Sequence, residues 1–222
     1  MEKLKAKVTK IEENTPDVRT IHFLVDGKAL DFTAGQYITV YFDETGQKAG
    51  KAYSLSSAPD DKEMTITVKR IGEFSGKLHS LKRGNEVIIS RPYGFFNVKD
   101  DKPIIAIAAG VGISPIWSII RDELPGGRKV ELLYSNKTAS DVALKDEIDK
   151  LHGLRTKYFL TREKAPSFIN RRIDIGKDID TTEEASYYIC GSQDFVTAMW
   201  QQLATAGIDE KAISTETFFE NQ

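Results

Sequence analysis

The segment IIAIAAGVGISPI, residues 104–116, constrains the fold more than any other part of this 222-residue chain. Its uninterrupted apolar start is typical of a strand buried on both faces. Gly110 and Gly112 follow at once, and an amphipathic pattern begins at Pro115. We predict a buried strand, a tight turn and then a helix, because proline is favoured in the first helical turn.

The rest of the chain after residue 100 repeats this alternation of strand and helix. Further segments typical of strands lie at 129–135, 154–161, 186–191 and 212–218. Segments with helical periodicity lie at 115–124, 141–151 and 192–207. Such alternation predicts an α/β domain with a parallel sheet and helices on both of its faces.

The first hundred residues have a different pattern. Six short segments typical of strands, separated by turn-forming residues, lie at 5–13, 18–26, 37–43, 51–57, 63–71 and 85–94. Strands at this spacing predict an antiparallel six-stranded β-barrel or sandwich, with one helix at 74–84. We therefore expect a β-barrel domain at residues 1–100 and an α/β domain at residues 101–222.

Charge and cysteine content narrow the function classes. The formal net charge is -2, so no strong attraction to nucleic acid is expected. No apolar segment resembles a signal peptide or approaches the roughly 20 residues that span a bilayer. The single cysteine, Cys190, can form neither an internal disulfide nor a cysteine-held cluster, and the histidines show no metal-ligand spacing. We expect a cytoplasmic protein without metal and without membrane insertion.

The turn after the buried strand is a candidate phosphate site. Backbone N–H groups and the helix dipole of a strand–Gly-x-Gly–helix unit attract anions. Gly110 and Gly112 permit close approach, and Pro115 stiffens the turn without a lost hydrogen bond. The same residues also fit an ordinary strand–helix turn in which the glycines only relieve crowding, so both interpretations stand.

The residues that end the next two strands bear on the type of nucleotide. In the usual NAD arrangement an acidic residue at the second strand end binds the ribose hydroxyls, and none is present here. The polar residues at these two strand ends are Ser135, Asn136, Lys137, Thr161 and Arg162. Two cations at one sheet edge suit a phosphate and favour NADPH over NADH, although Lys137 and Arg162 could also be solvated loop charges.

Five motifs in order resemble the ferredoxin–NADP reductase-like flavoprotein superfamily. They are KAYSLSSAP, GEFSGKL, AAGVGISP, YICGS and the C-terminal TETF, and the resemblance covers essentially the whole chain. It implies a flavin-binding barrel, an NAD(P)-binding α/β domain and an NAD(P)H-dependent oxidoreductase. Pro115 belongs to this family pattern.

The resemblance implies a set of flavin-binding residues in the barrel. Tyr53 is expected to lie against the flavin ring, and Ser54 to hydrogen-bond near its N5 atom. Lys51 stands where the family has an arginine that pairs with flavin phosphate. Lysine keeps the charge but loses the bidentate fork, so weaker flavin binding is expected. The other implied flavin contacts are Ala52, Val68, Lys69, Arg70, Gly72 and Ser75.

The resemblance also implies residues for the nicotinamide side. Cys190 and Gly191 match the pair that places a thiol near the nicotinamide. Glu216 and Phe218 match the terminal acid and aromatic residue beside the flavin. Ser54, Cys190 and Glu216 are therefore the expected catalytic residues. Because a lone buried cysteine is typical of core packing, the assignment depends on the whole set.

The acceptor and the flavin stay open at this point. FAD is the expected flavin and FMN the alternative. Many relatives carry a four-cysteine [2Fe–2S] domain, which this chain cannot form, so electrons are expected to pass to an acceptor such as a ferredoxin or an oxygenase component. One alternative is a free-flavin reductase that uses flavin as a substrate. The other is an electron-transfer or regulatory subunit of a larger complex.

Overall fold

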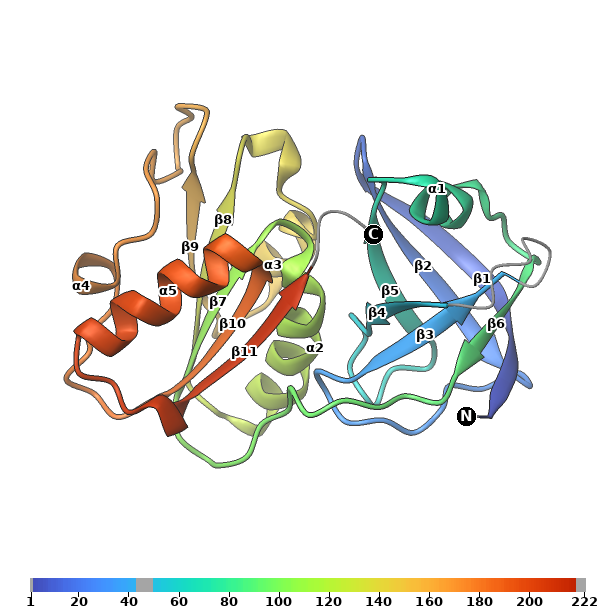
Figure 1. Ribbon diagram of the computed structural model, residues 1–222, viewed down its shortest axis with the longest axis horizontal. Helices are drawn as coiled ribbons and strands as arrows, with labels where there is room; N and C mark the ends of the chain where they lie inside the picture. The colour runs from blue at the N-terminus through green and yellow to red at the C-terminus, as the bar shows by residue number, and fades with distance from the viewer. Residues whose placement is uncertain (1, 43–49, 219–222) are drawn as a thin grey trace.

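The computed structural model describes residues 2–42 and 50–218, which form two domains side by side (Figure 1). The first is a six-stranded sheet with the order β4-β3-β6-β1-β2-β5, in which every pair is antiparallel. A bridge between Leu55 and Ile66 joins its two edges into a barrel. The strands are β1 (Lys3–Thr15), β2 (Val18–Val25), β3 (Tyr37–Tyr41), β4 (Lys51–Ser54), β5 (Met64–Lys69) and β6 (Glu86–Ser90).

Alternation of apolar and polar residues produces the barrel core. Along β2, Ile21, Phe23 and Val25 are buried, and the residues between them are more exposed. The helix α1 (Glu73–Ser80) follows β5 and buries Phe74 and Leu78 against this core. The predicted antiparallel barrel is therefore confirmed.

The second domain is a parallel five-stranded sheet with the order β11-β10-β7-β8-β9. Its strands are β7 (Ile104–Ala109), β8 (Val130–Asn136), β9 (Arg155–Leu160), β10 (Ser186–Ser192) and β11 (Ile213–Phe218). Its helices are α2 (Ile113–Glu123), α3 (Lys145–Lys150), α4 (Ile175–Asp178) and α5 (Gln193–Thr205). The change of sheet falls between Ser90 and Ile104, and we propose residue 100 as the boundary.

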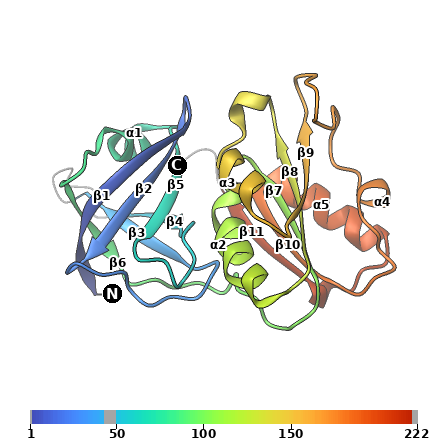
Figure 2. The same ribbon diagram turned by 180° about the vertical axis from the view of Figure 1, so that it is seen from behind.

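Helices cover both faces of the parallel sheet, as predicted. On one face, α2 and α3 pack on alternate side chains of β7, such as Ile104 and Ala106. On the other face, α4 and α5 pack on Ile105 and Ile107. Seen from behind, α2 lies between the sheet and the barrel (Figure 2). Its residues 113–120 are all buried for this reason.

Two helices differ from their predicted extents. The pattern at 74–84 yields α1, which ends at Ser80. The helical pattern at 141–151 yields only α3, which begins at Lys145. Val142 and Leu144 are buried in the core, and Leu144 has a left-handed backbone with a φ of 59°. Because these residues are buried by a segment that is not helical, the helix begins only after Leu144. The short helix α4 was not predicted.

Candidate functional site

The three residues expected to be catalytic meet between the two domains. The hydroxyl of Ser54, at the end of β4, donates a hydrogen bond to Oε1 of Glu216 over 2.9 Å. Glu216 lies in β11 and is in register with Cys190 of the neighbouring strand β10. The pairing of parallel strands therefore places the thiol and the carboxyl side by side, and docking of the barrel adds the hydroxyl.

Burial sets the protonation of this group. It raises the pKa of Glu216 to about 7, although the hydrogen bond from Ser54 opposes the shift. Burial also raises the pKa of the Cys190 thiol, and the nearby Glu216 carboxyl raises it further. Oε2 of Glu216 is buried and has no hydrogen-bond partner in the described part of the chain. The site therefore contains a neutral thiol and a carboxyl group that titrates near neutral pH.

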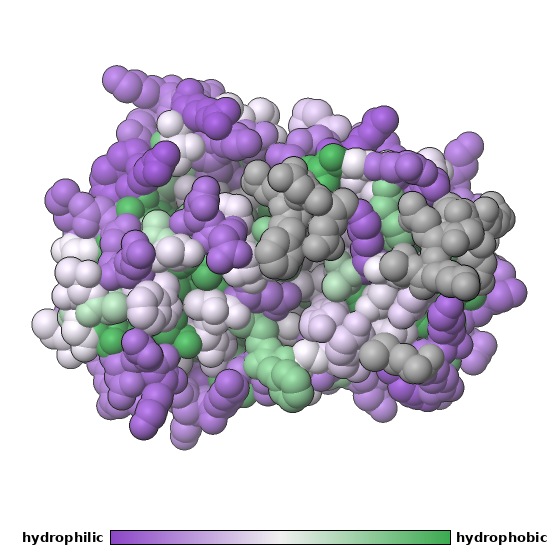
Figure 3. All heavy atoms as spheres, in the orientation of Figure 1, coloured by the Kyte–Doolittle hydropathy of each residue, from purple (hydrophilic) through white to green (hydrophobic). Residues whose placement is uncertain are grey.

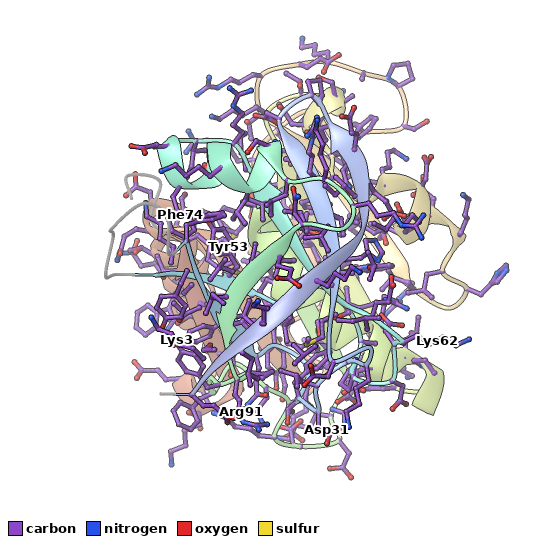
Figure 4. All side chains as sticks on the ribbon, turned by 90° about the vertical axis from the view of Figure 1, so that its right-hand side faces the viewer. Lys3, Asp31, Tyr53, Lys62, Phe74 and Arg91 are labelled. Atoms are coloured by element: carbon purple, nitrogen blue, oxygen red, sulfur yellow. The ribbon has the colours of Figure 1, made fainter. Side chains whose placement is uncertain are left out.

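Tyr53 and Lys51 share one aromatic support. The ring of Tyr53 stacks on that of Phe74, with centroids 6.2 Å apart and planes 22° apart. Figure 4 shows these two residues close together on the barrel. The ammonium of Lys51 lies 5.6 Å from the same Phe74 ring. Phe74, at the start of α1, thus supports both the expected flavin platform and the expected phosphate cation.

The other expected flavin contacts differ in what they offer. The Ala52 side chain is exposed, whereas that of Val68 is buried in the barrel core. The ammonium of Lys69 forms an ion pair with Asp17 at 3.1 Å. The Arg70 side chain is exposed. The Val68 and Lys69 side chains are therefore both engaged within the barrel, and the Val68 carbonyl lies 2.8 Å from Nε2 of His79.

The turn into α1 is shaped by Ser75. Its hydroxyl accepts hydrogen bonds from the N–H groups of Ile71, over 2.9 Å, and Gly72, over 3.0 Å. The same hydroxyl donates to the Gly72 carbonyl over 3.1 Å. These bonds hold the first turn of α1, where unpaired N–H groups attract anions. The Ser75 hydroxyl therefore holds the backbone of the candidate phosphate-binding turn in place.

The glycine turn of the second domain fits a close approach by an anion. Gly110 has a left-handed φ of +52°, and no atom lies within 4 Å of where its Cβ would be. A Cβ on Gly112 would lie 2.3 Å from the carbonyl oxygen of Cys190, so this glycine is required for packing. Pro115 lies in the first turn of α2, as expected. The hydroxyl of Tyr134 donates to the Gly110 carbonyl over 3.0 Å and anchors the turn.

The polar strand ends are brought together as predicted. The N–H of Thr161 donates to the carbonyl of Asn136 over 3.0 Å, and that of Arg162 donates to the carbonyl of Lys137 over 2.9 Å. Lys137 and Arg162 are exposed, whereas Ser135 is buried. Both polar atoms of the buried Asn136 amide lack a hydrogen-bond partner among the described residues. The two cations therefore lie at one edge of the sheet.

Two further expected residues lie close to Cys190 and Glu216. A Cβ on Gly191 would lie 2.7 Å from the ring of Phe195, so this position requires glycine. Phe218 ends β11 and is partly buried against the core beneath the sheet. The ring of Phe218 is therefore fixed by packing in the α/β domain.

These residues fit a flavin and a nicotinamide nucleotide. The buried Oε2 of Glu216 and the unpaired Asn136 amide are orphaned polar groups, which are rare unless a ligand or water satisfies them. The open left-handed turn at Gly110 offers N–H groups to a pyrophosphate. Tyr53 offers a supported aromatic face. The expected contacts lie on both sides of the domain junction.

Sequence reasoning did not single out Phe74 or Tyr134. Phe74 lies inside the motif GEFSGKL, and its place next to the Gly72 turn was the available signal. Tyr134 lies in a strand, where an aromatic residue is ordinary, so its hydroxyl contact with Gly110 had no local signal.

One cavity lies away from these residues. It has a volume of about 570 Å³, is lined by residues of both domains such as His22 and Trp117, and contains none of the expected site residues. The described residues include no group of His, Cys, Asp and Glu arranged to bind a metal ion. Across residues 2–42 and 50–218, no helix has the length and apolarity to cross a membrane.

Two family models match the chain. The oxidoreductase FAD-binding domain matches residues 5–98, and the oxidoreductase NAD-binding domain matches residues 106–201. The matches coincide with the barrel and with most of the α/β domain. A flavohemoprotein of Bacillus subtilis (strain 168) is 31% identical over 212 residues, which are 87% of this chain and 53% of that protein. The chain spans about half the length of the curated relatives it matches.

Solved structures agree with the family models. The FAD/NAD binding domain of nitric oxide dioxygenase from Vibrio cholerae has a TM-score of 0.88 and 26% identity, and the match covers 97% of this chain and 98% of that one. A ferredoxin NADP+ reductase from Neisseria gonorrhoeae, with FAD and NADP bound, has the same fold with a TM-score of 0.84, 21% identity and coverage of 99% and 100%. With both domains matched in order, this chain belongs to the ferredoxin–NADP reductase-like oxidoreductases, which combine a FAD-binding with an NAD-binding domain.

Proposed function

We propose that this chain transfers hydride from NADPH, or alternatively NADH, to FAD held by the barrel. The electrons then pass to a separate acceptor such as a ferredoxin or an oxygenase component. The hydrogen bond between Ser54 and Glu216 carries this proposal, because it joins the expected flavin side and nicotinamide side at one point.

The barrel would bind and orient the flavin. Tyr53, stacked on Phe74, offers a face for the ring. Lys51 and the N-terminal end of α1, whose preceding turn is held by Ser75, offer positive charge for the phosphates. FMN would use the same groups, so the barrel alone does not distinguish it from FAD.

The α/β domain would bind and orient the nicotinamide nucleotide. The turn at Gly110 and Gly112 leads into α2 and offers N–H groups to the pyrophosphate. Lys137 and Arg162 lie together at the strand ends, where a 2′-phosphate can contact both. Two exposed cations support NADPH as the donor, and the nearby Glu163 carboxylate is engaged by the N–H of Ala139 over 2.7 Å.

The three central residues would serve the transfer itself. Bound FAD supplies the hydride-accepting chemistry. Cys190 is a small buried side chain in register with Glu216, which leaves room for a stacked ring beside the carboxyl group. Glu216 can hold or release a proton near neutral pH, and Ser54 links it to the flavin side. Close packing of these residues would exclude water from the reacting atoms.

The acceptor is proposed from the relatives and from the surface. The neighbour from Neisseria gonorrhoeae is a ferredoxin NADP+ reductase, which supports a ferredoxin as the first acceptor to test. Figure 3 shows a mostly hydrophilic face with small, separate hydrophobic areas. In the described part of the chain, the large exposed hydrophobic side chains are Ile71 and Phe95. A small protein acceptor held by polar contacts fits such a face better than an extended apolar partner does.

An anaerobic visible absorption spectrum of the purified protein, before and after NADPH or NADH, tests the proposal. We expect a flavin band that bleaches, faster with NADPH. Tyr53→Ala should purify with less flavin, which would tie the band to the barrel site. A band that neither nucleotide bleaches would contradict the proposal and favour a subunit that works only within a complex.

Lys51 favours a second candidate, a free-flavin reductase. A lysine lacks the bidentate phosphate contact of arginine, so it supports weaker and exchangeable flavin binding. Colourless purified protein that saturates with added riboflavin or FMN would support this candidate. Flavin that stays bound through gel filtration would exclude it.

A further inference from the structure

We propose that three polar side chains on one face of α2, namely Ser114, Ser118 and Arg121, dock the α/β domain onto the barrel and thereby position the nicotinamide nucleotide against the flavin. These residues, together with their barrel partners Thr67, Ser57 and Asp61, form what we call the α2 seam. The positioning role rests on the proposed hydride transfer, whereas the docking role does not.

Two serines of the seam donate to main-chain carbonyls of the barrel. The Ser114 hydroxyl donates to the carbonyl of Thr67 over 3.2 Å, and the Ser118 hydroxyl donates to the carbonyl of Ser57 over 2.6 Å. Both serines are at most 1% exposed. A buried hydroxyl needs a partner, so each serine favours one placement of α2 on the barrel.

An ion pair extends the seam to the surface. The guanidinium of Arg121 contacts both carboxylate oxygens of Asp61, and the Nη2–Oδ1 distance is 2.7 Å. The Asp61 carboxylate also accepts from the N–H of Ala58 over 2.9 Å, which ties the pair to the loop between β4 and β5. A bidentate pair defines orientation as well as distance.

The spacing of the three residues is that of one helix face. Positions 114, 118 and 121 differ by four and then three residues, so their side chains line one side of α2. The neighbouring Ile116, Ile119 and Ile120 are fully buried in the core of the α/β domain. The helix therefore uses apolar side chains for its own sheet and directional polar contacts for the barrel.

The seam connects directly to both halves of the site. The turn of Gly110–Gly112 leads straight into α2, and Ser114 lies in the first turn of that helix. Thr67 lies in β5 immediately before Val68, where the flavin contacts are expected. A rigid helix anchored at Thr67 therefore sets the distance from the glycine turn to β5. Hydride transfer is sensitive to displacements of about 1 Å.

Packing is incomplete at the outer end of the seam, where the Arg121–Asp61 ion pair lies. The cavity of about 570 Å³ opens at the Arg121–Asp61 end of the seam and is lined there by Ser56 and Asp61 of the barrel and by Trp117 and Arg121 of α2. Domains joined without a large apolar interface are expected to move relative to each other. The directional contacts of the seam limit that motion.

The double variant Ser118→Ala/Arg121→Gln tests this role against a matched double variant, Ser90→Ala/Arg171→Gln. Ser90 is also fully buried. Within the barrel, its hydroxyl donates to the carbonyl of Arg91 and also accepts from the N–H of Thr39. Arg171 forms a bidentate pair with Asp178 within the α/β domain. The control therefore loses at least as many hydrogen bonds as the seam variant, all of them within single domains.

Calorimetry of the apoprotein and single-turnover flavin reduction provide two independent readouts. For the seam variant we expect the single unfolding transition of the wild type to split into two, and NADPH to reduce the flavin at least about tenfold more slowly. Dissociation constants for FAD and NADPH should change by less than about twofold, because the seam residues are not placed at either ligand. The control should keep one transition and the wild-type rate.

Several outcomes would overturn the inference. One is a seam variant with a single transition and the wild-type reduction rate, and another is a control variant that is slowed as much. If the seam double variant does not fold, the single variant Arg121→Gln, at the outer end of the seam, is used instead. Its flavin must be reduced more slowly than that of Arg171→Gln. If neither nucleotide reduces the wild type, hydride transfer fails as the function, while calorimetry still decides whether the seam couples the domains.

Discussion

The hydroxyl of Ser54 donates a hydrogen bond to the carboxylate of Glu216 over 2.9 Å, although the two residues lie 162 positions apart in the chain and in different domains. This bond leaves the other carboxylate oxygen of Glu216 buried without a partner among the described residues. Domain docking therefore creates a buried polar contact that neither domain has alone, and protonation of the Glu216 carboxyl group should affect stability.

Glu216→Gln should remove a pH dependence from the stability of the apoprotein. Burial raises the pKa of Glu216 to about 7 in the folded protein, from an ordinary value of 4.5. Between these values the folded state binds more protons than the unfolded state, so stability falls as pH rises. The loss is complete above pH 7 and is at most about 3 kcal/mol. Denaturant unfolding at pH 5 and pH 8 measures it.

The exposed Glu210→Gln variant controls for a change of net charge. Glu216→Gln should lose less stability between pH 5 and pH 8 than either the wild type or this control. Equal losses in all three proteins would show that Glu216 ionises without penalty in the folded state.

Cys190→Ala should slow flavin reduction while the flavin stays bound. The thiol is fully buried and in register with Glu216, on the strand expected to face the nicotinamide. Loss of the sulfur atom should alter ring placement and reduce the single-turnover rate by about tenfold or more. Met199→Ala, at a buried position of α5, controls for loss of core volume. An unchanged rate would assign Cys190 to packing alone.

Arg162→Ala should reduce the preference for NADPH over NADH. Arg162 is exposed, and its N–H donates to the carbonyl of Lys137, so the two residues are neighbours at this edge, where we propose that a 2′-phosphate binds. Loss of one such charge-assisted contact costs about 1.5–3 kcal/mol, which corresponds to about tenfold or more in kcat/KM for NADPH. The value for NADH should be nearly unchanged. Lys164→Ala is the matched control, and an equal ratio in both variants would exclude a phosphate contact.

Lys51→Arg should tighten the binding of FAD but not that of riboflavin. Arginine restores the planar fork that binds phosphate at two points, and riboflavin has no phosphate. We expect a dissociation constant for FAD that is lower by about threefold to tenfold, measured by flavin fluorescence quenching. Lys28→Arg, at an exposed position of the barrel, serves as the control. Equal tightening for riboflavin would place Lys51 away from the phosphates.

Phe74→Leu should weaken the binding of FAD and riboflavin alike. The Phe74 ring stacks on Tyr53 and contacts the Lys51 ammonium. Its loss should therefore leave both the Tyr53 ring and the Lys51 side chain less firmly positioned. Aromatic pairs contribute about 0.5–1.5 kcal/mol beyond burial, which corresponds to about twofold to tenfold in affinity. Phe23→Leu removes a ring from the same core but keeps the ring pair of Tyr53 and Phe74. Similar affinities for both variants would contradict the support role.

The sequence by itself determined the order and type of most elements. Alternation of strand and helix after residue 100 predicted the parallel sheet, and the segment 104–116 became β7, the glycine turn and α2. These features are local, because the period of apolar residues reports directly which face of a strand or helix is buried. The five motifs then carried the family resemblance, which the matches to both domains confirmed.

Only the tertiary structure decided how these elements meet. Leu144 takes a left-handed conformation that shortens the predicted helix to α3, and Lys69 is drawn into an ion pair with Asp17. The contact of Ser54 with Glu216 and the α2 seam both depend on how one domain docks on the other. Periodicity encodes which side chains are buried but not which distant partner buries them, so these contacts follow from packing of the whole chain.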